Sequence, residues 1–181
     1  MARLLTQYKD QIASALKDEF SIGNVMAIPK LEKIVISMGT GWAKDEKARF
    51  EVAQKQLTLI AGQKPVICLA KKSVSNFKLR EGSPVGLKAT LRGERMYEFF
   101  DRLVSLAIPR VKDFRGLNPS GFDGRGNYNM GLNEQSVFPE IDPVSITFNQ
   151  GMNICFQTST NNDEQARALL KALGMPFATS N

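Results

Sequence analysis

The chain has 181 residues, 43% of them hydrophobic and 23% charged, and a net charge of +6 at pH 7, which is typical of one globular domain (1–181) that buries a core without disulfides or metals. The absence of histidine removes the commonest general base, and two distant cysteines cannot form a Cys/His zinc site. No apolar run of about 18 residues and no signal-peptide core are found, so neither a membrane span nor secretion is expected.

Hydrophobic periodicity predicts four elements in the first part of the chain: a helix over 2–20, a strand over 31–39, a helix over 46–61 and a strand over 65–70. In the first strand Ile34, Ile36 and Met38 alternate with polar residues and are expected to face the core. Asp45 is the predicted N-cap of the second helix, and Gly62 is its predicted stop.

A basic loop, 71–86, is predicted to be exposed, because it combines Ser, Asn, Gly and Pro with four basic residues. The later elements are a strand over 85–93, a helix over 94–107, a Gly/Asn/Pro-rich loop over 113–143, a hairpin of 144–149 with 152–159, and a helix over 163–173. Asn162 and Gln165 resemble a capping box at the start of the last helix.

This order of elements predicts an α+β fold. Strands joined by short turns favour a mainly antiparallel sheet, with the helices packed on one face and the other face open, as a two-layer sandwich. The polar sides of two predicted strands, Lys33 with Ser37 and Lys88 with Thr90 and Arg92, are then expected to line the open face.

The net charge is concentrated in one segment, 64–95, which holds eight basic and two acidic residues, while the remainder of the chain holds sixteen of each. The basic residues of this segment are Lys64, Lys71, Lys72, Lys78, Arg80, Lys88, Arg92 and Arg95. A charge gathered in this way indicates a polyanionic partner.

The strand 85–93 is the strongest candidate for nucleic-acid contact. Lys88, Thr90 and Arg92 are predicted to point to the same side at intervals of about 6.5–7 Å, comparable to the spacing of successive phosphates, with the Thr90 hydroxyl between the two basic groups. A solvated strand face is the plainer alternative. In the basic loop, Phe77 lies between Lys72 and Lys78, and either stacks on an unpaired base or anchors the loop from below.

Other chemistry is not supported by the sequence. The glycines of 124–131 and 39–41 match neither the dinucleotide fingerprint nor a phosphate-binding loop. The carboxylates of Glu134, Glu140 and Asp142 are best explained as solvated loop groups. No activated nucleophile with a base is present, so no enzyme, cofactor or metal site is expected, and Cys68 and Cys155 are expected to be reduced and buried in the cytosol.

Three segments, NVMAIPKLEKIVISMGTG, KKSVSNFKLREGSPVGLKATLRG and GFDGRGNYNMGLNEQSVFPEID, resemble the signature blocks of the large-subunit ribosomal protein numbered five. This resemblance covers nearly the whole chain and implies a structural protein of the cytoplasmic ribosome that binds 5S rRNA in the central protuberance. The implied partners are 5S rRNA, nearby 23S rRNA, the P-site tRNA, the small-subunit head protein numbered thirteen and neighbouring 5S-associated proteins, with no membrane or small-molecule substrate.

The resemblance also implies site residues. Those for rRNA are Lys30, Lys33, Ser37, Gln63, Lys64, Lys88, Thr90 and Arg92. Those for the tRNA elbow are Lys71, Lys72, Phe77, Lys78 and Arg80. Those for the bridge to the small subunit are Arg110, Lys112, Arg115, Asp142 and Ser145. Ser37 stands where the family usually has Asn, which shortens the side chain and removes one donor.

Two alternatives come from other functional classes. One is a stand-alone module for single-stranded RNA, but Lys88, Thr90 and Arg92 occupy positions where such a module carries stacking aromatic rings. The other is a nucleotide-dependent enzyme that uses the glycine runs.

Overall fold

The computed structural model describes residues 2–41, 47–142, 146 and 148–178. The chain divides into two compact units, each built from separate stretches of sequence. Unit 1 comprises Met1–Ile34, Leu91–Met130 and Ile154–Asn181, and unit 2 comprises Val35–Thr90 and Gly131–Asn153. Asp45, the predicted N-cap, lies outside the described residues.

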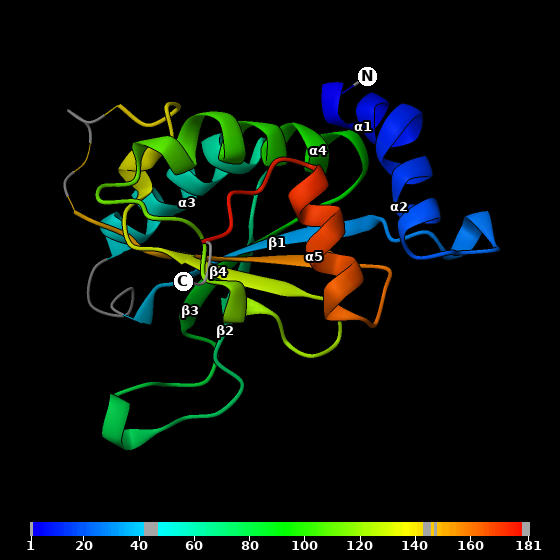
Figure 1. The fold of residues 1–181 in the computed structure, drawn as a ribbon. Coiled ribbons are helices and arrows are strands. Elements are labelled where there is room, and N and C mark those ends of the chain that lie inside the picture. The colour runs from blue at the N-terminus through cyan, green and yellow to red at the C-terminus, as the bar shows by residue number, and fades with distance from the viewer. Residues whose placement is uncertain (1, 42–46, 143–145, 147, 179–181) are drawn as a thin grey trace. The chain divides into compact units, whose positions relative to one another are not determined.

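A five-stranded antiparallel sheet in the order β2-β3-β1-β5-β4 confirms the predicted α+β class (Figure 1). Its strands are β1 (Leu31–Gly39), β2 (Val66–Leu69), β3 (Pro84–Leu91), β4 (Tyr128–Leu132) and β5 (Met152–Thr158). β1 has the predicted bounds, and Ile34, Ile36 and Met38 are buried as expected. β4 lies inside the predicted loop 113–143, where Tyr128, Met130 and Leu132 alternate with exposed residues.

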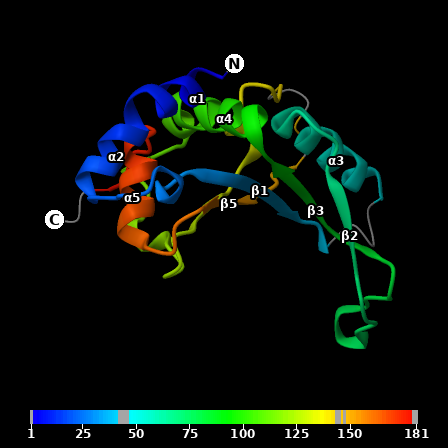
Figure 2. The ribbon, with the colours of Figure 1, turned by 90° about the vertical axis from the view of Figure 1, so that its right-hand side faces the viewer.

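Unit 1 holds most of the helices. They are α1 (Arg3–Gln7), α2 (Ala13–Glu19), α4 (Gly93–Arg102) and α5 (Asp163–Ala172). A π-helical turn, Tyr8–Ile12, joins α1 to α2, so the predicted N-terminal helix is continuous. α4 continues through a second π-helical turn, Leu103–Ala107, and ends in the 3-10 turn Ile108–Arg110. α1 packs against α4 and α2 against α5 (Figure 2).

Aromatic side chains fill much of the core of unit 1. The rings of Phe100 and Phe156 meet edge to face with 5.6 Å between centroids, and both side chains are fully buried. The Tyr128 ring contacts Phe177 in the same way at 5.3 Å, and its hydroxyl donates to the carbonyl of Asn118 at 3.0 Å. Edge-to-face contacts of this kind add to the stabilisation from burial.

A tight loop over 123–127 is fixed to the start of α5 by one carboxylate. The N–H groups of Gly124 and Gly126 donate to Asp163 at 3.0 and 2.7 Å. Both glycines have a left-handed backbone, with φ of +78° and +76°. The two glycines differ in the room available for a side chain. A Cβ on Gly126 would lie 2.2 Å from the carbonyl oxygen of Thr160, whereas a Cβ on Gly124 would meet nothing within 4 Å.

The predicted capping box of α5 is half right. The Asn162 side chain caps the helix by accepting the N–H of Glu164 at 2.9 Å. Gln165 does not return a bond to Asn162, because its Oε1 accepts the Thr160 hydroxyl at 2.6 Å, and the same hydroxyl oxygen accepts the N–H of Asn162 at 3.1 Å.

Unit 2 contains α3 (Lys47–Ala61) and the antiparallel pair of β2 with β3. The predicted apolar stripe of α3 is buried, and Gly62, with φ of +66°, follows its end. Cys68 pairs with Gly86 and Leu69 with Pro84, so Val85 is an extra residue on β3, and its carbonyl accepts the N–H of Thr40 instead. An extra residue of this kind bends the strand and increases its local twist.

Two buried glutamines, Gln135 and Gln150, form hydrogen bonds to backbone groups of unit 2. Gln135 donates to the carbonyl of Phe148 at 2.6 Å and accepts the N–H of Gln150. Gln150 in turn donates to the carbonyls of Gly39 and Gly151 at 3.2 and 2.9 Å. These bonds satisfy backbone groups in the stretch where a hairpin strand, 144–149, was predicted. The predicted strand 144–149 lies partly outside the described residues, and its described residues, 146, 148 and 149, belong to no strand. The second predicted strand of the hairpin, 152–159, is present as β5.

Candidate nucleic-acid interface

One side of β3 is core and the other carries polar side chains. Leu87 and Ala89 are 1% exposed, whereas Lys88 between them is exposed and Thr90 is half-buried. Because successive side chains of a strand point to opposite faces, Lys88 and Thr90 share the side away from the core. The predicted alternation of this strand is confirmed.

Gln63 and Ser37 add polar groups to unit 2. The Gln63 amide nitrogen donates to the carbonyl of Thr90 at 2.9 Å, which fixes the half-buried Gln63 side chain at β3. Lys64 follows it and is exposed, and Val66, two residues later, pairs with Lys88. Ser37 is half-buried on β1, opposite in direction to the buried Ile36 and Met38. Unit 2 therefore presents Gln63, Lys64, Lys88 and Thr90 on neighbouring strand segments.

Unit 1 presents Arg92, Lys30 and Lys33. Arg92 is exposed and continues the extended backbone of β3, with φ −140° and ψ 161°, to the start of α4. Lys30 is exposed, and its backbone exchanges two hydrogen bonds with Ser159, which hold it at the start of β1. Lys33 is half-buried on β1. These basic groups belong to backbone that strand pairing or a helix start holds in place.

The basic loop is ordered at its tip. Val74 and Leu79 exchange reciprocal backbone hydrogen bonds of 2.9 and 3.0 Å across a 3-10 turn, Ser75–Phe77. Lys78 has a left-handed backbone with φ of +50°. Residues 71–78 are exposed, and the tip of the loop folds into a small hairpin rather than an extended chain. The 71–86 sequence gave no period that would have indicated the Val74–Leu79 pairing.

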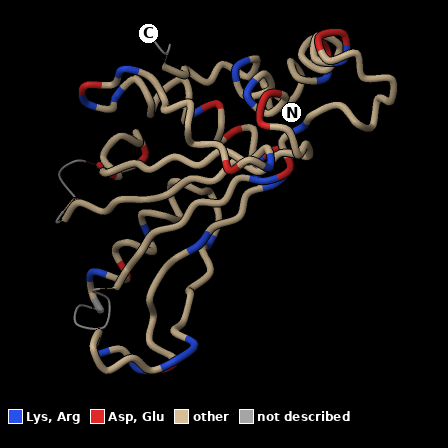
Figure 3. Tube along the Cα trace, turned by 60° about the horizontal axis from the view of Figure 1, so that its bottom comes forward, with Lys and Arg blue, Asp and Glu red and all other residues tan. Residues whose placement is uncertain are grey.

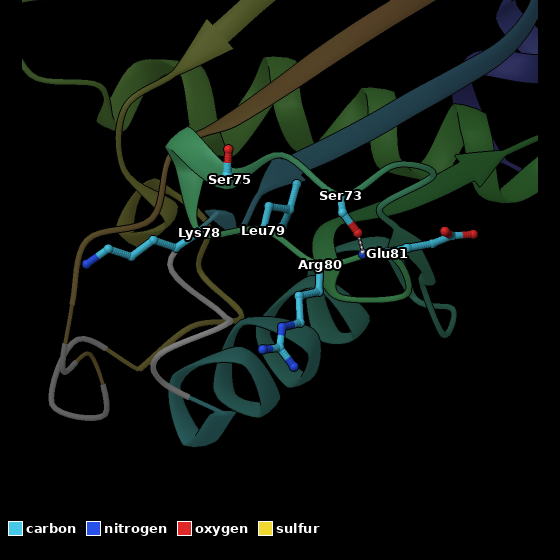
Figure 4. A pocket seen from close by; sticks show the side chains of 6 residues that line it. All are labelled: Ser73, Ser75, Lys78, Leu79, Arg80 and Glu81. Atoms are coloured by element: carbon cyan, nitrogen blue, oxygen red, sulfur yellow. Dashed lines mark hydrogen bonds between the residues drawn. The ribbon is translucent and has the colours of Figure 1, made fainter.

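A hollow of about 650 Å³ lies at this tip, lined by Ser73, Ser75, Lys78, Leu79, Arg80 and Glu81 (Figure 4). The Ser73 hydroxyl accepts the N–H of Glu81 at 3.0 Å and so ties the two sides of the loop together. Lys78 and Arg80 extend in different directions from the hollow. Ser73 and Ser75 were not among the predicted contacts, although hydroxyl groups beside cations are common phosphate ligands.

Phe77 is 71% exposed. The alternative that its ring anchors the loop from below is therefore wrong, and stacking on an unpaired base stays a prediction. Lys71, Lys72, Lys78 and Arg80 are exposed as well. Figure 3 shows basic positions gathered along this loop. The stretch from 52 to 80 contains no acidic residue, so Glu81 is the first carboxylate near the tip.

The predicted bridge residues fall in both units. Arg110, Lys112 and Arg115 are exposed in unit 1, on and after the 3-10 turn that ends the α4 segment. Asp142 is exposed in unit 2. Ser145 lies outside the described residues.

Other types of site find no support among the described residues. They contain no group of three or more His, Cys, Asp or Glu side chains that could hold a metal ion. No helix in the described ranges is long and apolar enough to cross a membrane. Cys68 and Cys155 form no disulfide among the described residues, and both are half-buried rather than buried as predicted.

Comparison with known families decides the broad class. A family model described as Ribosomal protein L5 matches residues 24–80, and one described as ribosomal L5P family C-terminus matches residues 84–177. The chain belongs to the ribosomal protein L5 family. L5-family proteins are structural and non-enzymatic, which confirms the prediction that this chain is not an enzyme.

Full-length relatives agree with this assignment. A protein of Alkaliphilus oremlandii (strain OhILAs) named Large ribosomal subunit protein uL5 is 56% identical over 98% of this chain and 99% of its own length. Proteins of the same name from Psychrobacter sp. (strain PRwf-1) and Thermoanaerobacter sp. (strain X514) are 55% and 52% identical over the same shares. The resemblance seen in the three sequence blocks is therefore confirmed at the level of the L5 family.

Proposed function

We propose that this L5-family protein, a structural constituent of the large ribosomal subunit, binds 5S rRNA and helps to attach it in the central protuberance. The observation that carries the proposal is the division of β3, where Leu87 and Ala89 are buried and the alternating Lys88 and Thr90 are turned away from the core. The proposed rRNA contacts are Lys30, Lys33, Ser37, Gln63, Lys64, Lys88, Thr90 and Arg92.

The proposed mechanism is recognition of RNA shape rather than base sequence. Lys88, Lys64 and Arg92 neutralise phosphates, and charge-assisted bonds of this type are stronger than neutral ones. The hydroxyls of Thr90 and Ser37 bond to phosphate oxygens or ribose 2′-hydroxyls, which mark RNA rather than DNA. Because backbone pairing holds these strand segments, little conformational entropy is lost when RNA binds.

The basic loop contacts the elbow of the P-site tRNA in this proposal. Its reciprocal Val74–Leu79 bonds set the tip before binding, and Phe77 offers an exposed ring for stacking on an unpaired base or a sugar. Lys71, Lys72, Lys78 and Arg80 are exposed on the same loop and add positive charge to it.

Arg110, Lys112, Arg115 and Asp142, with Ser145, are proposed to contribute to a bridge to the small-subunit head protein numbered thirteen. Nearby 23S rRNA and the other 5S-associated proteins are further proposed neighbours. Membership of the L5 family locates the protein on the ribosome, which is cytoplasmic in bacteria.

A salt titration of 5S rRNA binding tests the central proposal. If about five phosphates are engaged, log K falls against log salt with a slope of about −3.5 to −4.5. The assay compares a folded 5S transcript with a poly-pyrimidine strand of equal length. Affinity that does not change with salt, or equal affinity for the unstructured strand, contradicts recognition of folded RNA and favours a single-strand module.

Deleting 73–83 tests the separate role of the loop. Binding of 5S rRNA is expected to be unchanged, because the rRNA contacts lie on strand segments outside the deletion, whereas tRNA occupancy of ribosomes that carry the variant falls. Equal loss of both activities refutes the division of roles.

A further inference from the structure

β2 is an edge strand whose apolar side chains are exposed. It is the terminal strand in the order β2-β3-β1-β5-β4, so no described strand lies beyond it. Val66, Ile67 and Leu69 are 68%, 40% and 57% exposed. Proteins usually protect an edge with charges, proline or a covering element, because an open apolar edge pairs readily with other chains.

The backbone of β2 also offers hydrogen-bonding groups to that edge. Ala70 donates to the carbonyl of Ser83 at 2.9 Å and accepts the N–H of Gly82 at 3.0 Å, so its polar groups face the β3 side. In an antiparallel ladder these directions alternate, which also turns those of Cys68 and Val66 toward β3. The N–H and C=O groups of Ile67 and Leu69 therefore point to the open edge.

Charge selects the occupant. The stretch from 52 to 80 contains no acidic residue and surrounds β2 with exposed Lys64, Lys71 and Lys72. Antiparallel pairing of β2 with a second copy of itself would bring Lys64 of one chain opposite Lys71 and Lys72 of the other, which is repulsive. RNA would place hydrated phosphates and sugars against Ile67 and Leu69 and would not match the alternating donors and acceptors of the edge.

We propose that β2 is a docking edge for an extended segment of another polypeptide, with acidic flanks, which adds to the sheet as a further strand. Main-chain hydrogen bonds from Ile67 and Leu69 provide the affinity, and the lysines at both ends of β2 select the acidic flanks. This mode of recognition is β-augmentation. It shares Lys64 with the proposed 5S rRNA surface and Lys71 and Lys72 with the basic loop, but it rests on the open edge of β2 and not on the polar side of β3.

Two labelled peptides with the same Thr-Val-Thr-Val centre test the proposal, one flanked by Glu-Glu and the other by Lys-Lys. The full-length protein is expected to bind the Glu-flanked peptide saturably in fluorescence anisotropy and to show no saturable binding of the Lys-flanked peptide. Amide exchange at Ile67 and Leu69 is expected to slow when the peptide binds, while the Cys68 amide is already protected in the free protein. Equal binding of the two peptides, or unchanged exchange at both amides, overturns the proposal.

Two variants of one residue isolate the backbone bond. Leu69→Ser removes the apolar side chain but keeps the N–H, whereas Leu69→Pro also removes the N–H, at a position whose partner, Pro84, has none to lose. Leu69→Pro is expected to bind the Glu-flanked peptide at least about five-fold more weakly than Leu69→Ser, as for one lost hydrogen bond. Leu59→Ser, at another exposed leucine on α3, is the control and leaves binding unchanged.

The outcomes separate this proposal from the proposed function. Both Leu69 variants are expected to bind 5S rRNA as the unmodified protein does and to show the same circular dichroism. Equal peptide binding by Leu69→Ser and Leu69→Pro overturns the strand-pairing model.

Discussion

Replacing Gly126 by alanine is expected to lower the free energy of unfolding by about 3–6 kcal/mol. The left-handed backbone at φ +76° contributes about 1–2 kcal/mol of this cost. The new Cβ would lie 2.2 Å from the Thr160 carbonyl oxygen, so the loop must move. That movement breaks the bond from the Gly126 N–H to Asp163 and the 2.7 Å bond from the Thr158 hydroxyl to the Gly126 carbonyl, together worth about 2–4 kcal/mol.

Gly124→Ala is the matched control. Gly124 has nearly the same φ, +78°, and donates to the same carboxylate, but a Cβ there meets nothing within 4 Å. Its expected cost is about 1 kcal/mol, from backbone strain reduced by the lower entropy of the unfolded chain. Urea unfolding followed by circular dichroism measures both variants. Equal losses for the two would show that the Thr160 contact does not restrict this loop.

Three further predictions concern RNA contact and pH. Arg92→Ala is expected to weaken 5S rRNA binding by about 1.5–3 kcal/mol with no change in unfolding, because Arg92 is exposed and makes no capping bond; a filter-binding titration that shows full affinity contradicts its role. Phe77→Ala is expected to weaken tRNA binding to reconstituted ribosomes by about 1–3 kcal/mol, whereas tRNA binding equal to that of the unmodified protein rules out stacking. Burial and then the charge of Tyr8 raise the pKa of Tyr97 from 10.0 to about 12. The unfolded chain therefore loses this proton first, and stability falls between about pH 10 and pH 12 by up to about 2.7 kcal/mol. Tyr97→Phe should remove that part of the decline in urea titrations, and an unchanged slope would refute the assignment.

The sequence predicted best those elements in which a regular pattern extends over several turns or residues. β1 has the predicted bounds because nine residues alternate without interruption, and the stripe of α3 is buried as its spacing required. The same alternation correctly separated Lys88 from Leu87 and Ala89, which is the basis of the candidate interface.

Short-range competition between neighbouring groups could not be predicted. The Thr160 hydroxyl accepts the N–H of Asn162, which a capping box would pair with the Gln165 side chain. No periodic pattern in the sequence indicates that Thr160 lies close enough to compete. β4 was merged into a loop because glycines and asparagines surround its five residues. The Val74–Leu79 bridge depends on a single left-handed residue, Lys78, which no composition rule identifies.

The extra residue Val85 affects the direction of the basic loop. Val85 lies at the base of the β2–β3 hairpin. A small change of strand twist at this position changes the direction of the whole basic loop. Adding or removing residues near Ser75 would change the length of the basic loop, whereas deleting Val85 would change its direction. Changes in length are therefore expected to be better tolerated at the tip of the basic loop than at Val85.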